Sequence, residues 1–245
     1  RLAAEQGLIV TAVAWLDTRI EHNEKELAAL ISAVRQNKNI ERVIVGNEAI
    51  LRGDMTVADL VKKIKLIKKK VGVPVSTAEP WHIWLRHPEL AKQLAFITVH
   101  LLPYWEGLPI DAALDYVFDR LDELQAAYPK KKIVIGEVGW PSQGDRVRGA
   151  LATPLAQARF MREFVLRAAQ RKVEYYVMEA FDQPWKVNHE GRTGAYWGMF
   201  FADRTPKFAF SGPVTPDPAW PHKALASVLL AAPFMFWFAF VFRRL

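Results

Sequence analysis

The stretch IVIGEVGWPS, residues 133–142, is the part of this 245-residue chain that decides the fold. Apolar residues and a glycine lead into Glu137, and the Gly-Trp-Pro that follows cannot easily continue a strand. The same pattern occurs in IERVIVGNEAI, residues 40–50, where a second apolar run and glycine precede Glu48. Each stretch predicts a buried strand with a carboxylate at its carboxyl end. Only folding could bring these two glutamates together.

Short apolar, β-branched runs alternate with helical patterns along most of the chain. The predicted strands span 8–14, 42–45, 73–77, 96–100, 132–135 and 174–178. The predicted helices span 23–36, 56–70, 88–93, 110–127 and 153–171. Continuous apolar strands are typical of a parallel sheet that is buried on both faces, so the fold class is α/β.

Two architectures fit this alternation, an open doubly wound sheet and a (β/α)₈ TIM barrel. A doubly wound nucleotide-binding sheet should show a Gly-rich turn after one strand, and the sequence shows none. Polar and aromatic residues instead follow nearly every strand, as on the catalytic face of a barrel. They are Trp15 and Asp17, Asn47 and Glu48, Glu79 and Trp81, His100 with Tyr104 and Trp105, Glu137 and Trp140, and Glu179 and Asp182. We therefore expect a barrel truncated at its N-terminus, because six units are two short of eight.

The formal net charge of +7 raises the alternative of a nucleic-acid-binding protein. The densest basic run, residues 61–72, places its lysines between apolar residues at helical spacing, which is typical of a solvated helix face. No aromatic or Gly-rich nucleic-acid motif accompanies it. Cysteine is absent, and the six histidines show neither H-E-x-x-H nor a paired spacing. We expect no nucleic-acid partner, no metal and no cofactor.

The run ALASVLLAAPFMFWFAFVF, residues 224–242, contains no charged residue. A helix of this length spans roughly 28 Å, close to the hydrocarbon core of a bilayer, so we predict a transmembrane helix, with a buried core helix as the alternative. The following Arg243 and Arg244 predict a cytoplasmic C-terminal end and a catalytic domain on the periplasmic or extracellular side. The chain opens in mid-pattern without Met, and we expect a piece of a longer membrane protein. The predicted parts are a barrel domain over 1–212, a Pro-rich linker over 213–223 and the transmembrane helix.

Two carboxylates that face one pocket suit glycoside hydrolysis. One protonates the leaving oxygen while the other attacks the sugar carbon, so the pocket must keep one carboxyl protonated and the other ionised. Asn47, beside Glu48, offers an amide for a sugar 2-hydroxyl. Flat aromatic side chains near strand ends suit sugar binding, and of these Tyr104 and Trp140 are the best candidates.

Four motifs in this order, VIVGNEAI, FITVHLLPYW, IVIGEVGWPS and VMEAFDQPWK, resemble glycoside hydrolase family 17. This family comprises β-1,3-glucanases and β-1,3-glucanosyltransferases, and the chain is most similar to bacterial membrane-linked members. The likeness covers most of residues 7–201. It implies a (β/α)₈ barrel of which strands 3 to 8 are present, and a reaction on β-1,3-glucan that retains anomeric configuration through a covalent glucosyl-enzyme.

By this resemblance Glu48 matches the acid/base and Glu137 matches the nucleophile. Asn47 matches the partner of the 2-hydroxyl. The other matches are to residues that line the site or lie near the nucleophile, and these are Tyr104, Glu179 and Lys186. Membrane-linked relatives are associated with building or remodelling glucans, sometimes beside a glycosyltransferase on the same polypeptide, which favours transfer over hydrolysis.

A second hypothesis is a non-catalytic glucan-binding domain of a membrane glucan synthesis or export system. Such a domain would keep the barrel and its aromatic residues. It would have no need for two strand-end glutamates plus Asn47, so the sequence favours the enzyme.

Overall fold

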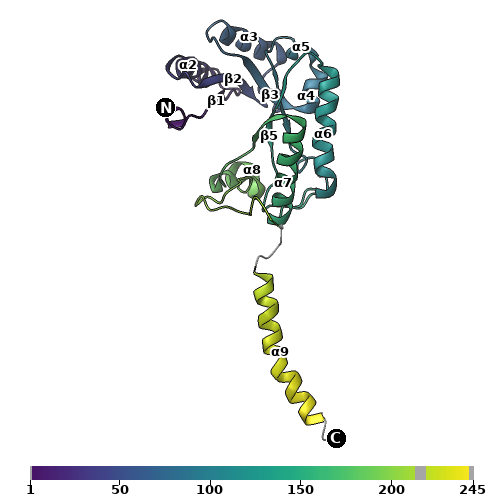
Figure 1. Ribbon diagram of the computed structural model, residues 1–245. Helices are drawn as coiled ribbons and strands as arrows, with labels where there is room; N and C mark the ends of the chain where they lie inside the picture. The colour runs from purple at the N-terminus through teal and green to yellow at the C-terminus, as the bar shows by residue number, and fades with distance from the viewer. Residues whose placement is uncertain (1, 213–218, 243–245) are drawn as a thin grey trace. The chain divides into compact units, whose positions relative to one another are not determined.

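The computed structural model describes residues 2–212 and 219–242, which fall into two compact units, Arg1–Lys207 and Phe208–Leu245. The first unit is built on one parallel sheet of six strands in the order β1-β2-β3-β4-β5-β6 (Figure 1). The strands are β1 (Val10–Ala14), β2 (Ile40–Asn47), β3 (Val75–Pro80), β4 (Ile97–Leu101), β5 (Ile133–Val138) and β6 (Glu174–Val177). Each strand therefore pairs with its neighbour in the sequence.

Helices lie before β1, between consecutive strands and after β6. In chain order they are α1 (Leu2–Glu5), α2 (Ile20–Gln36), α3 (Val57–Lys68), α4 (Trp81–Arg86), α5 (Pro88–Ala91), α6 (Ile110–Ala127), α7 (Pro154–Arg171), the 3₁₀ turn η1 (Pro184–Lys186) and α8 (Val187–Gly194). Side chains start two of the long helices, because Thr56 accepts a hydrogen bond from the amide of Asp59 and Thr153 accepts one from that of Ala156. Crossovers between parallel strands are right-handed, and with a sequential strand order they place every crossover helix on the same face of the sheet. The opposite face of the sheet carries no crossover helix and forms the interior of the curled sheet.

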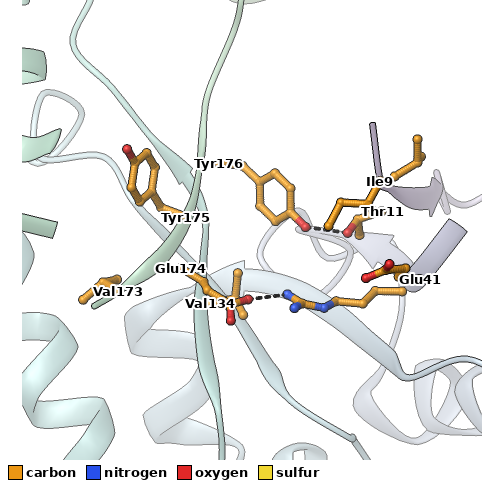
Figure 2. Close-up of a pocket in the computed structure, with 10 residues that line it drawn as sticks. Ile9, Thr11, Glu41, Val134, Val173, Glu174, Tyr175 and Tyr176 are labelled. Carbon is orange, nitrogen blue, oxygen red and sulfur yellow. Dashed lines mark hydrogen bonds and ion pairs between the residues drawn. The ribbon is translucent and has the colours of Figure 1, made fainter. Parts of the chain in front are cut away.

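The sheet curls far enough for its first and last strands to meet through side chains. The hydroxyls of Thr11 on β1 and Tyr176 on β6 are hydrogen-bonded, and Arg42 pairs with Glu174 at 2.7 Å (Figure 2). A cavity of about 450 Å³ lies among these residues, and a second cavity of about 110 Å³ is lined by residues from all six strands. This curvature fits a (β/α)₈ barrel that lacks two of its units.

The structure confirms the six strands that the sequence predicts, and their parallel order. The five predicted helices are also present, and the one predicted over 88–93 is the short α5. Helices α1, α4 and α8 were not predicted, because their short segments lack the repeated apolar spacing that marks a long amphipathic helix. α8 contains a non-helical residue at Gly191, which further hides it from pattern analysis.

The second unit contains the helix α9 (Trp220–Phe242), which begins before the predicted start at residue 224. It is the one helix in the described part of the chain that is long and apolar enough to cross a membrane. Its large apolar side chains are exposed, among them Leu230, Phe236 and Trp237. Residues 213–218 of the predicted linker, and Arg243 and Arg244, lie outside the described residues.

Gly136 on β5 is required by close packing inside the sheet. A Cβ atom there would lie 2.5 Å from Thr98 Cγ2 and 2.9 Å from His100 Cε1. We expect Gly136→Ala to lower the free energy of unfolding by about 1–3 kcal/mol, because the interior has no room for the added methyl group. Gly72→Ala is the matched control, since no atom lies within 4 Å of its added Cβ. Urea unfolding measures both, and equal midpoints would contradict this account.

Candidate active site

Glu137 lies near the carboxyl end of β5, where the pairing with β4 shifts by one residue. Val99 pairs with Ile135, but the next residue of β4, His100, pairs with Glu137, so Gly136 is an extra residue in β5. Such a bulge breaks the alternation of side chains between the two faces of a sheet. Gly136 and Glu137 consequently both line the interior cavity. The bulge turns the carboxylate into the barrel.

β2 carries a matching irregularity before Glu48. Ile44 pairs with Ser76 and Asn47 pairs with Ala78, which leaves one more residue on β2 than on β3 between these pairs. Asn47 lines the same interior cavity as Glu137. Both glutamates that the sequence predicts as catalytic therefore follow a glycine in a bulged strand, and they lie at the same end of the sheet.

The two carboxylates influence each other's ionisation. Burial raises the pKa of Glu137 to about 7, and the ammonium group of Lys186 and a hydrogen bond from Asn47 oppose this rise. Burial also raises the pKa of Glu48; the positive form of His100 would lower it, and repulsion from Glu137 raises it further. The glutamates therefore titrate as a coupled pair, in which the ionisation of one makes ionisation of the other harder.

Lys186 and Glu179 form an ion pair beside this carboxylate pair. The Lys186 ammonium donates to Glu179 Oε1 and lies 3.4 Å from Glu190 Oε1 on α8. Burial raises the pKa of Glu179, and the hydrogen bond from Lys186 opposes that rise. Five of the predicted site residues thus belong to one electrostatic cluster. They are Asn47, Glu48, Glu137, Glu179 and Lys186.

Tyr104 and Trp140 lie in the core and are not exposed. Both side chains are fully buried, and their rings pack edge to face at 5.4 Å. The Tyr104 hydroxyl donates to the carbonyl of Asp145, and the Trp140 indole donates to that of Leu151. Because both rings are buried, the structure does not support the prediction that they contact sugar. Sequence spacing identified aromatic residues after strands, but it could not separate packed rings from exposed ones.

Other aromatic side chains remain open to solvent. Trp15 is 45% exposed, Trp105 is 43% exposed and Trp185 is 60% exposed. The guanidinium group of Arg52 lies 4.4 Å from the centre of the Trp15 ring. Rings of this kind present an open face that can stack on a flat apolar surface.

Two buried polar residues also support the site, and the sequence analysis placed both among the strand-end residues but not among the catalytic or substrate-binding candidates. Glu79, the last residue but one of β3, is fully buried and accepts hydrogen bonds from the amides of Ile50 at 2.8 Å and Leu51 at 3.2 Å. It therefore holds the turn that follows Glu48, and burial raises its own pKa to about 7. His100, on β4, is hydrogen-bonded through Nε2 to Asn47 Oδ1 at 2.8 Å. The sequence signal for both was a polar residue at the end of an apolar strand.

The described residues, 2–212 and 219–242, contain no group of three or more His, Cys, Asp or Glu side chains that could hold a metal ion.

Residues 1–198 match a family model described as the BtgE/BtgC glycoside hydrolase domain. The chain belongs to this family. It is 30% identical to glucan 1,3-beta-glucosidase of Arthroderma benhamiae, over 84% of this chain and 72% of that protein. It is 25% identical to the Aspergillus terreus protein named "Probable glucan endo-1,3-beta-glucosidase btgC", and there it spans only 32% of the relative's length.

The glycoside hydrolase domain also resembles solved structures. One is the glycoside hydrolase family 17 β-1,3-glucanosyltransferase from Rhizomucor miehei, with 28% identity, a TM-score of 0.77 and coverage of 85% of this chain and 79% of that one. An active-site mutant of the Rhizomucor enzyme in complex with laminaritriose gives 29% identity, a TM-score of 0.75 and coverage of 83% and 76%. These relatives are fungal, so they do not confirm the bacterial membrane-linked type expected from the sequence.

The backbone of this glycoside hydrolase domain is strained at Glu48. Glu48 has a φ of 53°, in the left-handed region that residues other than glycine rarely adopt. Its amide donates to the carbonyl of Ala78 at 2.8 Å, and its carbonyl accepts from the amide of Arg52 at 2.9 Å. These bonds hold Glu48 in a conformation that costs free energy, and strain of this kind clusters at functional sites.

We expect Glu48→Gly to be more stable than Glu48→Ala by about 1 kcal/mol, because glycine adopts a positive φ without steric cost. Both variants lack the carboxylate, so their difference isolates the backbone term. Thermal and urea unfolding of the two proteins measure it. A Glu48→Ala variant as stable as Glu48→Gly would show that the backbone at Glu48 is not strained.

Proposed function

We propose that this chain is a retaining β-1,3-glucan glycosidase or glucanosyltransferase that uses Glu48 as acid/base and Glu137 as nucleophile. The observation that carries the proposal is the pair of mutually repelling carboxylates from two bulged strands, with the Asn47 amide beside them. The names of the Arthroderma and Rhizomucor relatives support β-1,3-glucan as the substrate class.

In the first step the Glu137 carboxylate attacks the anomeric carbon while the Glu48 carboxylic acid gives its proton to the departing glycosidic oxygen. The C–O bond to the leaving sugar breaks, and an ester bond to Glu137 forms. In this mechanism the Asn47 amide bonds the sugar 2-hydroxyl, an interaction that strengthens in the transition state.

In the second step Glu48, now ionised, takes a proton from an acceptor hydroxyl that attacks the same carbon and releases Glu137. Water as the acceptor gives hydrolysis, and a sugar hydroxyl gives transfer. The likeness to the Rhizomucor glucanosyltransferase supports transfer as the main outcome.

The assignment of the two roles rests on the groups that face each carboxylate. Lys186 and the Asn47 amide both favour the ionised form of Glu137. Once Glu137 is ionised, its charge raises the pKa of Glu48, which keeps that residue protonated. Burial and the charge of Glu190 oppose this assignment, and with all of these groups present the pKa of Glu137 is raised to about 7. The donors around Glu137 are therefore the reason to assign it as nucleophile.

The apolar helix α9 supports a second part of the proposal, in which a linker and a transmembrane helix tether the barrel domain to a membrane. At 23 residues α9 spans about 35 Å, which is enough to cross a bilayer. The two arginines after it favour a periplasmic or extracellular catalytic domain. The glycosyltransferase on the same polypeptide remains an expectation from the resemblance.

The two-glutamate mechanism predicts the products and the labelled residue. The full-length protein should convert β-1,3-gluco-oligosaccharides, and Glu48→Gln and Glu137→Gln should each lower kcat at least about 100-fold, because each removes a required proton carrier or nucleophile. Mass spectrometry of the products separates transfer, which gives chains longer than the substrate, from hydrolysis. Glu41→Gln, at an exposed position outside the proposed site, is the matched control.

A 2-deoxy-2-fluoroglucoside with a good leaving group should trap the covalent intermediate on Glu137, as found by mass analysis of the labelled peptide. A label on Glu48 would reverse the two roles. A wild-type protein that binds the oligosaccharides but leaves them unchanged would replace the enzyme with the binding-domain hypothesis.

Membrane insertion of α9 should depend on its apolar centre. We expect Leu230→Arg to move the full-length protein from the membrane pellet towards the soluble fraction after alkaline extraction, because an arginine at a helix centre costs about 2.5–3.5 kcal/mol on insertion. Leu230→Ala is the matched control and should stay in the pellet. If the arginine variant also stays there, α9 does not anchor the protein by spanning the bilayer.

A further inference from the structure

His100 is a buried histidine in the middle of the proposed site. Its side chain is 3% exposed and lies on β4, between β3 and the glutamate-bearing β5. Two small residues, Ala78 on β3 and Gly136 on β5, line the same interior cavity as His100. A Cβ atom on Gly136 would lie 2.9 Å from the imidazole Cε1. The neighbouring strands therefore leave a slot that the imidazole ring fills.

The hydrogen-bond geometry defines the tautomer of this ring. His100 Nε2 lies 2.8 Å from Asn47 Oδ1 and 3.6 Å from Glu137 Oε1, and both of these atoms are acceptors. Burial lowers the pKa of His100 to about 4, so near neutral pH the ring carries a single hydrogen. Among the residues that the structure describes, Nδ1 has no hydrogen-bond partner. The hydrogen therefore belongs on Nε2, which donates to Asn47.

The opposite arrangement is unfavourable at both ends of the ring. A hydrogen on Nδ1 would be a buried donor without a partner, which costs about 1–3 kcal/mol. A bare Nε2 would then direct its lone pair at the oxygens of Asn47 and Glu137. The geometry therefore favours the tautomer with the hydrogen on Nε2.

The bond from His100 determines which way the Asn47 amide faces. With Oδ1 held by the imidazole, the amide hydrogens of Nδ2 are left for other acceptors, and a hydrogen bond from Asn47 stabilises ionised Glu137. The main-chain carbonyl of Asn47 is held separately by the guanidinium group of Arg52 at 2.5 Å. The side chain of Asn47 is thus held by His100, and its main chain is held by Arg52.

We propose that His100 is a positioning residue of the active site, which holds Asn47 Oδ1 so that the Asn47 amide hydrogens face Glu137 and the bound sugar. This inference rests on the proposed function. It adds a residue that acts through Asn47 and lies 3.6 Å from Glu137 Oε1, too far for a hydrogen bond to that carboxylate.

The test compares two substitutions at His100 in the full-length protein. His100→Leu fills the slot but cannot donate, and we expect kcat/KM on β-1,3-gluco-oligosaccharides to fall about 10- to 100-fold. The acidic limb of the pH profile should move to higher pH, because Glu137 loses a donor that favours its ionised form. The charged groups that face Glu137, namely Glu48, Lys186 and Glu190, stay in place. His100→Gln carries an amide donor at a similar reach and should restore most of the activity and the wild-type limb.

A double-mutant cycle separates positioning from general structure. If His100 acts through Asn47, then His100→Leu in an Asn47→Ala background should cause little further loss, whereas independent effects would multiply. His87→Gln, at a histidine outside the site, is the matched control, and unfolding curves show whether each variant is folded.

The outcomes distinguish the inference from the proposed function. An active wild type with a folded His100→Leu variant of equal activity and unchanged pH profile would overturn the role of His100 and leave the function standing. Multiplicative losses in the cycle would also overturn it. A wild type without turnover would overturn the proposed function itself, whatever His100 does.

Discussion

The site depends on one extra residue in each of two strands. In a regular strand, successive side chains point to opposite faces, so a residue next to Gly136 would point away from the barrel interior. The bulge at Gly136 changes this, and Glu137 lines the interior directly after the glycine. β2 has a bulge of its own before Asn47 and Glu48. A strand buried on both faces can then end in a carboxylate that reaches the interior.

Polar residues in the interior are paired between neighbouring strands. Thr98 donates to the hydroxyl of Ser76 at 3.1 Å, and Ser76 donates to the carbonyl of Phe96 at 2.7 Å. His100 on β4 reaches across β3 to Asn47 on β2. A shift of the strand pairing by one residue would turn each side chain of the shifted strand to the opposite face of the sheet. Buried polar groups would then lose their hydrogen-bond partners, which would lower the free energy of unfolding. These bonds therefore help to fix the strand register that the two bulges need.

The sequence predicted the parts of this arrangement that local pattern determines. Apolar runs gave the six strands, and a carboxylate after a glycine at a strand end identified Glu48 and Glu137 as site candidates. It could not show that Trp140 is buried or that His100 reaches Asn47, because these contacts join segments far apart in the chain. The bulges were equally hidden, since register depends on which residues the neighbouring strand presents. A glycine before each glutamate was their only local sign.

The positive charge of Lys186 favours the ionised form of Glu137. A buried ion pair outside the carboxylate cluster helps to hold Lys186 in place. Lys186 belongs to the segment after β6, and the position of this segment depends on Asp182, whose carboxylate accepts from Lys207 at 2.6 Å. The side chains of Lys207 and Asp182 are only 1% and 4% exposed, and Lys207 also donates to Ser142 in the loop after β5. Losing one partner would leave a buried charge uncompensated, which costs about 3–5 kcal/mol. The loops that follow β5 and β6 are thereby joined through one ammonium group. The electrostatic balance at Glu137 is consequently set by the packing of both loops, and not by the sheet alone.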